Sequence, residues 1–359
     1  MKILHVITSL YTGGAERLMV DLLPLLRDKG DNQVDLLLIN GTQTPFKEKI
    51  EQAGIKVHAL SMKNDVYNWR NISRFRKFFA HSDYDIIHTH NTACQLFVPL
   101  SRVFTGKSKT KLVTTEHSTT NRRRSKWWLK PLDNWMYGKY DAIVCIAPKA
   151  QRNLEDYIGK KANVCTISNG VDTKRFMRPV KDISGQQRFV ITMVAALRIE
   201  KDHATVLRAM THLPEQYSLQ LVGGGPKEVA TSVKALCSQL ELDDRVSFLG
   251  VRMDVPDIME QSDILILSSH WEGLSLSSIE GMASGRPFIA SDVDGLRDTV
   301  TGAGVLFPHG DDKELAKKIQ WLCEHPDEYR KVAERCQARA AQYDISVMVD
   351  KYNELYHSL

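Results

Sequence analysis

The chain has 359 residues, of which 43% are hydrophobic and 25% charged, and its formal net charge is +5. This balance is typical of a globular protein of about two domains, and it excludes a disordered or fibrous chain. A charge this mild does not by itself indicate nucleic-acid binding.

No stretch approaches the roughly 18 apolar residues that a membrane-spanning helix needs. The N-terminus leads directly into a strand pattern, without the architecture of a signal peptide. The six cysteines include no C-x-x-C pair. We therefore expect a cytoplasmic protein with reduced thiols, and neither a disulfide nor a zinc framework.

The first half of the chain alternates short apolar runs with amphipathic stretches, which predicts an α/β domain with a parallel sheet. The runs expected to form strands are 2–8, 34–39, 55–60, 85–90, 111–115, 141–146 and 164–167. In such sheets ligands bind beyond the carboxyl ends of the strands, so polar residues at these ends are candidate site residues.

The loop after the first strand contains Gly13 and Gly14, and Glu16 follows. Two glycines let the backbone approach a ligand closely at a helix start, or they simply form a tight turn. The loop lacks the G-x-G-x-x-G pattern of a dinucleotide site.

Three histidines follow or end predicted strands: His88 and His90 on one strand, and His117 after the next. A lone histidine of this kind is often a loop residue with ordinary hydrogen bonds. His88 and His90 alternate on one strand and lack a carboxylate or cysteine at ligand spacing, so a zinc site is not expected.

The segment 121–140 combines a cationic cluster with tryptophans, which is the composition of a helix at a membrane interface. The alternatives are a solvated amphipathic helix that packs its tryptophans on the domain and, less in keeping with the motifs, a nucleic-acid contact. The candidate residues for a membrane or anionic acceptor are Arg122, Arg123, Arg124, Lys126, Trp127 and Trp128.

The polar segment 174–187 is the expected linker, and a second α/β pattern begins with a strand over 189–195. Arg198 and Lys201 follow that strand, where cations can hold a diphosphate. The Asp292-x-Asp294 pattern resembles a metal motif, but we interpret it as a loop.

A third strand-to-helix loop follows the apolar run 263–267. Backbone N–H groups over Gly273–Ser275 would point from the positive end of a helix that begins near Leu276, an arrangement that favours phosphate. Glu272 precedes this helix and Glu280 lies about one turn inside it, where carboxylates can accept hydrogen bonds from sugar hydroxyls. The donor-binding candidates here are Gly273, Leu274, Ser275, Leu276 and Glu280.

The order Glu272, seven residues, Glu280 and then Gly-Met-Ala-Ser-Gly-x-Pro resembles the signature of the family 4 retaining glycosyltransferases. The likeness extends along nearly the whole chain. It implies the GT-B fold, an α/β architecture of two Rossmann-like domains facing across a cleft. The expected domains are an N-terminal acceptor-binding domain over 1–178, a nucleotide-sugar-binding domain over 179–342, and a C-terminal helix over 343–359 that packs back on the first.

The resemblance also implies residue roles. Lys201 matches the lysine that grips the donor diphosphate, and Arg198 is the expected substitute for an arginine whose usual position holds Ala196. His117 matches a histidine beside the donor sugar, which makes His117, Glu272, Lys201 and Arg198 the catalytic candidates. Arg252 matches the segment beside the base, Gly14 the diphosphate loop, and Gly13 and Glu16 its acceptor side.

The implied activity is transfer of a sugar, with retention of configuration, from a nucleotide diphosphate sugar to a hydroxyl of a glycan or lipid-linked acceptor. UDP is favoured over GDP on family frequency, no metal or other cofactor is expected, and polysaccharide or lipopolysaccharide synthesis at the inner face of the membrane is the expected setting. The alternatives are a non-catalytic nucleotide-sugar-binding subunit, suggested by Ala196 and by Asp298 in place of a glutamate, or a GT-B epimerase.

Overall fold

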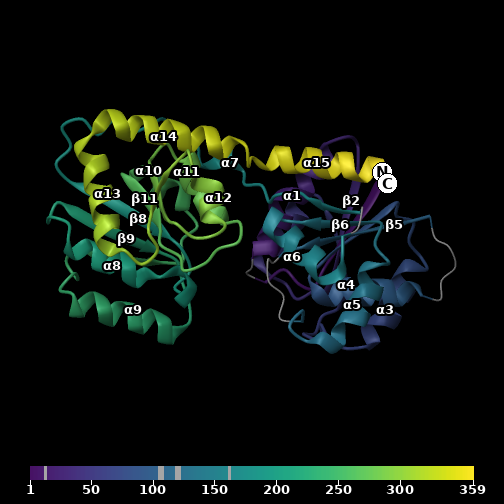
Figure 1. Cartoon of the computed structure of the whole chain (residues 1–359). Helices are drawn as coiled ribbons and strands as arrows, with labels where there is room; N and C mark the ends of the chain where they lie inside the picture. The colour runs from purple at the N-terminus through teal and green to yellow at the C-terminus, as the bar shows by residue number, and fades with distance from the viewer. Residues whose placement is uncertain (12–13, 104–108, 118–122, 161–162) are drawn as a thin grey trace. The chain divides into compact units, whose positions relative to one another are not determined.

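The computed structural model describes residues 1–11, 14–103, 109–117, 123–160 and 163–359 (Figure 1). The chain forms two compact units, one of Met1–Asn169 with Ile345–Leu359 and the other of Gly170–Asp344. Each unit is a parallel sheet with helices on both faces, so the expected pair of Rossmann-like domains is confirmed. Within the described ranges, no helix is long and apolar enough to cross a membrane.

The first unit contains a seven-stranded sheet in the order β3-β2-β1-β4-β5-β6-β7. Its strands are β1 (Lys2–Ile7), β2 (Gln33–Asn40), β3 (Lys56–Ser61), β4 (Ile86–His90), β5 (Lys111–Glu116), β6 (Ala142–Cys145) and β7 (Val164–Thr166). The chain reverses direction across the sheet between β1 and β4, which makes this point the topological switch where ligands bind in open sheets.

Helices cover both faces of this sheet because successive strand residues point to opposite sides. Leu36 packs in the core on the side of α1, whereas Leu37 packs in the core on the side of α4. The helices are α1 (Gly14–Asp28), α2 (Pro45–Gln52), α3 (Arg70–Phe79), α4 (Thr92–Arg102), α5 (Lys130–Tyr137) and α6 (Pro148–Ile158), with a 3₁₀ turn η1 (Trp127–Leu129).

The last helix, α15 (Ile345–Ser358), completes the first unit, where it packs against α1 (Figure 1). Its apolar face, including Val349 and Tyr352, belongs to the same core as α1. The side-chain amide of Asn32 donates a hydrogen bond to Asn353 at 3.2 Å. The C-terminal segment therefore belongs structurally to the N-terminal domain.

The second unit contains a six-stranded sheet in the order β10-β9-β8-β11-β12-β13. Its strands are β8 (Phe189–Val194), β9 (Tyr217–Val222), β10 (Val246–Gly250), β11 (Ile264–Leu267), β12 (Phe288–Ser291) and β13 (Val305–Phe307). Its helical elements are α7 (Thr173–Phe176), η2 (Ile199–Lys201), α8 (His203–Thr211), α9 (Lys227–Gln239), α10 (Val255–Gln261), α11 (Leu276–Ala283), α12 (Leu296–Val300), α13 (Asp312–Glu324) and α14 (Pro326–Ala341). The switch point here lies between β8 and β11.

The boundary between the units lies at Asn169, so the expected boundary at 178 and the linker over 174–187 are wrong. The backbone N–H of Val171 donates to the carbonyl of Tyr343 at 2.9 Å, and Phe176 and Ile183 are buried in the core of the second unit. The segment is polar overall, but these two apolar residues pack it onto the second unit, and its composition alone did not indicate this.

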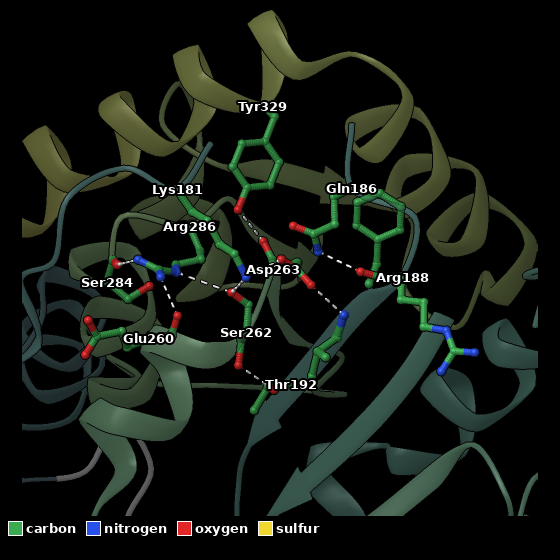
Figure 2. Close-up of polar contacts among 12 residues, drawn as sticks. Lys181, Gln186, Arg188, Thr192, Glu260, Ser262, Asp263, Ser284, Arg286 and Tyr329 are labelled. Carbon is green, nitrogen blue, oxygen red and sulfur yellow. Dashed lines mark hydrogen bonds and ion pairs between the residues drawn. The ribbon is translucent and has the colours of Figure 1, made fainter. Parts of the chain in front are cut away.

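A polar network at the amino ends of β8 and β11 also holds the segment that contains Lys181 (Figure 2). Lys181 Nζ lies 2.6 Å from the buried carboxylate of Asp263, which also accepts a hydrogen bond from the N–H of Val190 at 2.7 Å. The buried guanidinium of Arg286 donates to the backbone carbonyls of Ser262 and Ser284, at 3.3 and 2.8 Å. These contacts tie the amino ends of β8 and β11 together and leave their carboxyl ends to form the site.

Candidate functional site

The switch point of the second sheet places two sequence-distant loops side by side. One loop follows β8 and ends at Lys201, and the other follows β11 and contains Glu272. The backbone N–H of His270 donates to the carbonyl of Glu200 at 2.8 Å, which links the two loops directly. This is the edge at which a doubly wound sheet binds its ligand.

Lys201 and Glu272 form an ion pair at this edge, between Nζ and Oε1. Their side chains are 19% and 11% exposed, so the pair is largely shielded from water but still reachable. The hydroxyl of Ser269 donates to the same Glu272 oxygen at 2.7 Å. The structure thus brings together the two catalytic candidates that the sequence placed 71 residues apart.

Serine hydroxyl groups next to the Lys201–Glu272 pair hydrogen-bond to the backbone of both loops. Ser268 Oγ donates to the carbonyls of Lys201 and Asp202, at 3.1 and 2.8 Å, and Ser291 Oγ donates to the carbonyl of Ser269 at 2.7 Å. All three hydrogen bonds join neighbouring strands at their carboxyl ends. The lysine and the glutamate therefore extend from a rigid base.

Glycines allow these loops to pack closely. A Cβ atom on Gly223 would lie 2.0 Å from the carbonyl oxygen of Ala195, and one on Gly225 would lie 2.0 Å from that of Leu197. A Cβ atom on Gly295 would lie 2.1 Å from the carbonyl oxygen of Gly273. The glycine run after β9 thus packs against the loop that carries Lys201.

Helix α11 begins at the expected position, Leu276, directly after Gly273, Leu274 and Ser275. Ser275 is the N-cap residue, but among the described residues its hydroxyl contacts Ser277, at 3.1 Å, and does not cap the first turn. Glu280 lies half-buried in the second turn. The amino end of α11 thus lies in the loop that holds Glu272, and it favours an anion there.

Arg198 and Arg252 lie elsewhere. The Arg198 side chain is 62% exposed, and its Nη1 lies 3.8 Å from Glu200. Arg252 pairs with Asp254, with Nε 2.8 Å from Oδ1, on the exposed surface after β10. Within the described residues, the guanidinium groups of both arginines pair with other carboxylates and not with Glu272, although the backbone N–H of Lys201 donates to the carbonyl of Arg198 at 3.1 Å. Spacing from Lys201 was the basis for choosing Arg198, and spacing does not determine where an exposed side chain points.

The switch point of the first sheet contains the remaining candidates. Gly14 begins α1, and Glu16 in the first turn accepts a hydrogen bond from the Asn91 amide at 3.4 Å. Gly13 lies outside the described residues. His117 follows β5 at the same edge of the sheet, and its Nε2 lies 2.8 Å from Nδ1 of His90. Burial lowers the pKa of His117 to about 4, so its ring is neutral near pH 7.

His117 is the end of a cluster that sequence reasoning missed in part. His5 Nδ1 lies 3.0 Å from His90 Nε2, and the rings of His88 and His90 stack with centroids 4.3 Å apart. Residues 88 and 90 share one face of β4, and β1 pairs with β4 so that His5 lies opposite His88. The alternation of His88 and His90 was visible in the sequence, whereas the pairing that places His5 opposite His88 was not.

Glu116, before His117, is buried and fully engaged. Its carboxylate accepts hydrogen bonds from Gln95 and Tyr137, each at 2.7 Å, and from Arg124 at 2.9 Å. Arg123 similarly pairs with the buried carboxylate of Asp133. Arg123 and Arg124 are therefore not surface cations, contrary to the expected basic cluster. They neutralise carboxylates inside the domain.

The expected single helix over the basic-aromatic segment is also wrong. Pro131 lies in the first turn of α5, which begins at Lys130, and Trp127 and Trp128 lie in the preceding 3₁₀ turn. Both tryptophans are exposed, at 80% and 59%, and Lys126 Nζ lies 6.0 Å from the Trp128 ring. Arg122 lies outside the described residues.

Among the residues that the structure describes, two clusters have atoms close enough to share a metal ion: His5 with His88 and His90, and Asp202 with His270 and His309. In the second cluster the two histidines are hydrogen-bonded to each other at 2.6 Å. Asp202 also caps α8 by accepting the N–H of Thr205. Both groups are thus hydrogen-bonded within the protein.

The Asp292-x-Asp294 pattern lies in the loop after β12. Arg297 Nε donates to Asp292 at 2.5 Å, and Arg297 Nη1 lies 3.4 Å from Asp294. A cation of the protein itself thus faces both carboxylates. This arrangement supports the interpretation of the pattern as a loop.

Comparisons with known proteins place both halves of the chain among glycosyltransferases. The family described as Glycosyltransferase Family 4 matches residues 12–175, and the family described as Glycosyl transferases group 1 matches residues 175–341. A Campylobacter jejuni N-acetylgalactosaminyltransferase named for a diphospho-undecaprenol glycan is 25% identical, over 99% of this chain and 98% of its own. An Escherichia coli galactosyltransferase named for UDP-Gal and a diphosphoundecaprenol acceptor is 24% identical, over 82% of this chain and 80% of its own.

Among solved structures, Anabaena Alr3699/HepE in complex with UDP superposes with a TM-score of 0.86, at 22% identity and over 100% of both chains. The lipopolysaccharide galactosyltransferase WaaB in its apo form gives a TM-score of 0.76 at 16% identity, again over 100% of both chains. The GT-B fold class is thereby confirmed. Because the two family matches together span residues 12–341, the chain belongs to the family 4 glycosyltransferases.

Proposed function

We propose that this glycosyltransferase moves a sugar from a UDP-sugar to a hydroxyl of a lipid-linked glycan, with retention of configuration and without a metal ion. The observation that carries the proposal is the shielded Lys201–Glu272 pair beside the amino end of α11, at the switch point of the second sheet. Support for the donor comes from relatives and neighbours named for UDP and UDP-glucose, and support for the acceptor from relatives named for undecaprenol diphosphate.

The chemistry follows from the charges of these groups. When the bond between the sugar carbon and the diphosphate oxygen breaks, negative charge develops on the diphosphate. The Lys201 ammonium and the backbone N–H groups at the start of α11 would stabilise that charge. The acceptor oxygen forms the new bond to the same carbon, and its proton passes to a phosphate oxygen of the leaving group. Glu272 would hold sugar hydroxyls and Glu280 the ribose.

The catalytic candidates of the second domain differ in how firmly neighbouring residues hold them. Lys201 and Glu272 are pre-positioned by Ser268 and Ser269, whereas Arg198 has no such support and is assigned a secondary role in binding the diphosphate. On the acceptor side, Gly13 and Glu16 keep their proposed role because Glu16 is held by Asn91 at the switch point of the first sheet.

Calorimetric titration of UDP, GDP and ADP without added metal tests the donor site. UDP should bind the wild type, and Lys201→Ala should weaken binding by roughly 10- to 100-fold, because a hydrogen bond to a charged group is lost. Lys317→Ala removes an exposed lysine of the same domain and should leave affinity unchanged. Equal affinity in wild type and Lys201→Ala would contradict the proposal, and UDP binding without sugar transfer to any lipid-linked acceptor would favour a non-catalytic subunit.

We also propose that the first domain contacts an anionic membrane through Lys126, Trp127 and Trp128. Exposed indoles next to ammonium groups match the headgroup region of a bilayer. Vesicle co-sedimentation should show salt-sensitive binding to vesicles containing phosphatidylglycerol, and Trp127→Ala with Trp128→Ala should reduce it several-fold. Trp321→Ala removes an exposed tryptophan of the second unit as a control. Unchanged binding in the double variant would exclude this surface.

A further inference from the structure

The histidine cluster of the first domain forms a linear chain of hydrogen bonds that ends at His117. His5 Nδ1 contacts His90 Nε2 at 3.0 Å, and His90 Nδ1 contacts His117 Nε2 at 2.8 Å. His5 and His90 are completely buried on two adjacent strands, His5 within β1 and His90 at the carboxyl end of β4. His88 stacks on His90 and lies tilted against His5, but its own hydrogen bonds go to Tyr356 at 2.5 Å and Thr115 at 2.7 Å.

All members of the chain are neutral near pH 7, because burial lowers the pKa of His5 to about 3, of His117 to about 4 and of His90 well below its usual range. A neutral imidazole carries one N–H donor and one bare acceptor nitrogen. Two contacts in series therefore allow only two arrangements: each ring is protonated on Nδ1, or each ring is protonated on Nε2.

The free end of the chain distinguishes the two arrangements. Within the part of the chain that the structure describes, His5 Nε2 is buried and has no hydrogen-bond partner. If this atom carried the proton, it would be an orphaned buried N–H, which folded proteins rarely tolerate, whereas an unsatisfied acceptor is more common. The proton of His5 is thus placed on Nδ1, directed at His90.

We propose that His5 and His90 are positioning residues that hold His117 as its Nδ1–H tautomer. In this arrangement His5 Nδ1–H donates to His90 Nε2, and His90 Nδ1–H donates to His117 Nε2. The remaining His117 nitrogen, Nδ1, then presents a donor. Both residues act through His117 and need not touch a substrate.

The consequence is a defined chemical role for His117. A ring protonated on Nδ1 and engaged through Nε2 donates a hydrogen bond to a ligand oxygen, but it has no bare nitrogen with which to take a proton from an acceptor hydroxyl. His117 is thus a hydrogen-bond donor and not a general base. This role rests on the proposed function, since it requires a sugar at His117, whereas the tautomer itself does not.

A metal ion shared by His5, His88 and His90 is the competing explanation of the cluster. The ring nitrogens of His88 and His90 are all engaged in hydrogen bonds, and His5 Nε2 is the remaining one. A metal would have to replace several of these bonds. The observed geometry therefore favours the hydrogen-bonded chain.

A long-range ¹H–¹⁵N correlation spectrum of ¹⁵N-histidine-labelled protein at pH 7.5, without ligand, tests the proposal. Such a spectrum identifies which ring nitrogen carries the proton, and the His117→Ala variant assigns the His117 signals. The wild type should show a single Nδ1–H form of His117. His90→Asn keeps a side-chain N–H donor and should retain that form, whereas His90→Phe removes the donor and should produce a mixture of tautomers.

His88→Phe is the matched control, because it alters an equally buried, stacked ring outside the chain. It should leave the His117 signals in the Nδ1–H form even if the domain melts earlier. An Nε2–H form of His117 in the wild type, or an identical pattern in wild type and His90→Phe, would overturn the proposal. So would stoichiometric Zn²⁺ binding to the wild type that His88→Phe abolishes. If His90→Phe fails to fold, the wild-type spectrum still shows which ring nitrogen of His117 carries the proton, and so still tests the proposal.

The same samples separate this inference from the proposed function. UDP-glucose is titrated into the labelled wild-type protein and followed at His117 and by calorimetry. Failure of every nucleotide to bind while His117 remains in the Nδ1–H form would overturn the proposed function alone. Nucleotide binding with the opposite tautomer would overturn the positioning role alone.

Discussion

The Lys201–Glu272 pair fixes an ammonium group at the carboxyl ends of β8 and β11 in the absence of a ligand. Glu272 is itself fixed by Ser269, so the pair is rigid, and the 11% exposure of Glu272 limits competition from water. If Lys201 binds the donor diphosphate as proposed, the diphosphate must share it with this carboxylate. The pair would then stabilise the free enzyme at some cost to phosphate affinity.

Glu272→Gln should separate these two effects. The amide keeps the shape of the side chain and removes the negative charge that competes for Lys201. We expect UDP to bind as tightly as in the wild type or up to about fivefold tighter, equivalent to about 1 kcal/mol. Calorimetry on wild type, Glu272→Gln and Lys201→Ala measures this directly. Loss of UDP affinity in both variants would show that Glu272 binds the nucleotide itself.

At the residue scale, the sequence predicted site residues at the ends of adjacent strands, which the sheet brings together, but not the partners of residues on exposed loops. Lys201 and Glu272 follow adjacent strands of a parallel sheet, and their contact follows from that topology. Arg198 and Arg252 have equally suggestive positions, but nearby acidic residues, Glu200 and Asp254, bind them. The importance of His5 depended on strand register, which a single sequence does not give.

At the scale of elements, glycines determine how closely the site loops pack. Gly295 has φ = +85°, in the region that favours glycine, and its α-carbon faces the carbonyl oxygen of Gly273. The turn after β12 therefore packs directly against the backbone of the loop between Glu272 and α11. Any side chain at this position must displace that loop.

Gly295→Ala should therefore weaken UDP binding as well as lower stability. Gly302→Ala is a matched control, because Gly302 also has a positive φ, +78°, but its Cβ would meet no atom within 4 Å. Both variants should lose about 1 kcal/mol from backbone strain, and only Gly295→Ala should also lose UDP affinity, by about tenfold or more. Thermal melting and calorimetry provide the two measurements. Equal UDP affinity in both variants would contradict the supporting role.

Element boundaries were predictable where a local signal existed. Asp311, a residue type that favours helix N-caps, caps α13 by accepting the N–H of Glu314 at 2.9 Å. The basic-aromatic helix was wrong because Pro131 fixes the start of α5 after the tryptophans.

At the scale of the whole chain, both units bury histidines that stay neutral. The first unit contains His5, His88, His90 and His117, and the ring of His88 packs against Tyr352 and Tyr356 from α15. The second unit contains His203, whose pKa burial lowers to about 4 despite the adjacent Asp202. The boundary at Asn169 and the return of α15 place the C-terminal tyrosines within the first histidine cluster.

These histidines should make the protein sensitive to mild acid. In the unfolded chain a histidine takes up a proton near pH 6.5, whereas His5 in the folded chain does so only near pH 3. The stabilising contribution is therefore complete above about pH 7. It falls by about 1.4 kcal/mol per pH unit for each neutral histidine as the pH drops from 6.5 towards the folded-state values.

Melting temperatures measured by circular dichroism between pH 7.5 and 4.5 should fall steeply below pH 6.5. His5→Phe removes one proton-binding group from the unfolded chain, so its melting temperature should fall less steeply with pH, even if the variant is less stable at pH 7.5. His357→Gln alters an exposed histidine at the end of α15 and should retain the wild-type slope. Two results would contradict this prediction: a melting temperature that stays constant from pH 6.5 to 4.5, or an unchanged slope in His5→Phe. Either result would show that His5 is protonated in the folded protein over this pH range. The neutral hydrogen-bonded chain from His5 to His117 would then be wrong as well.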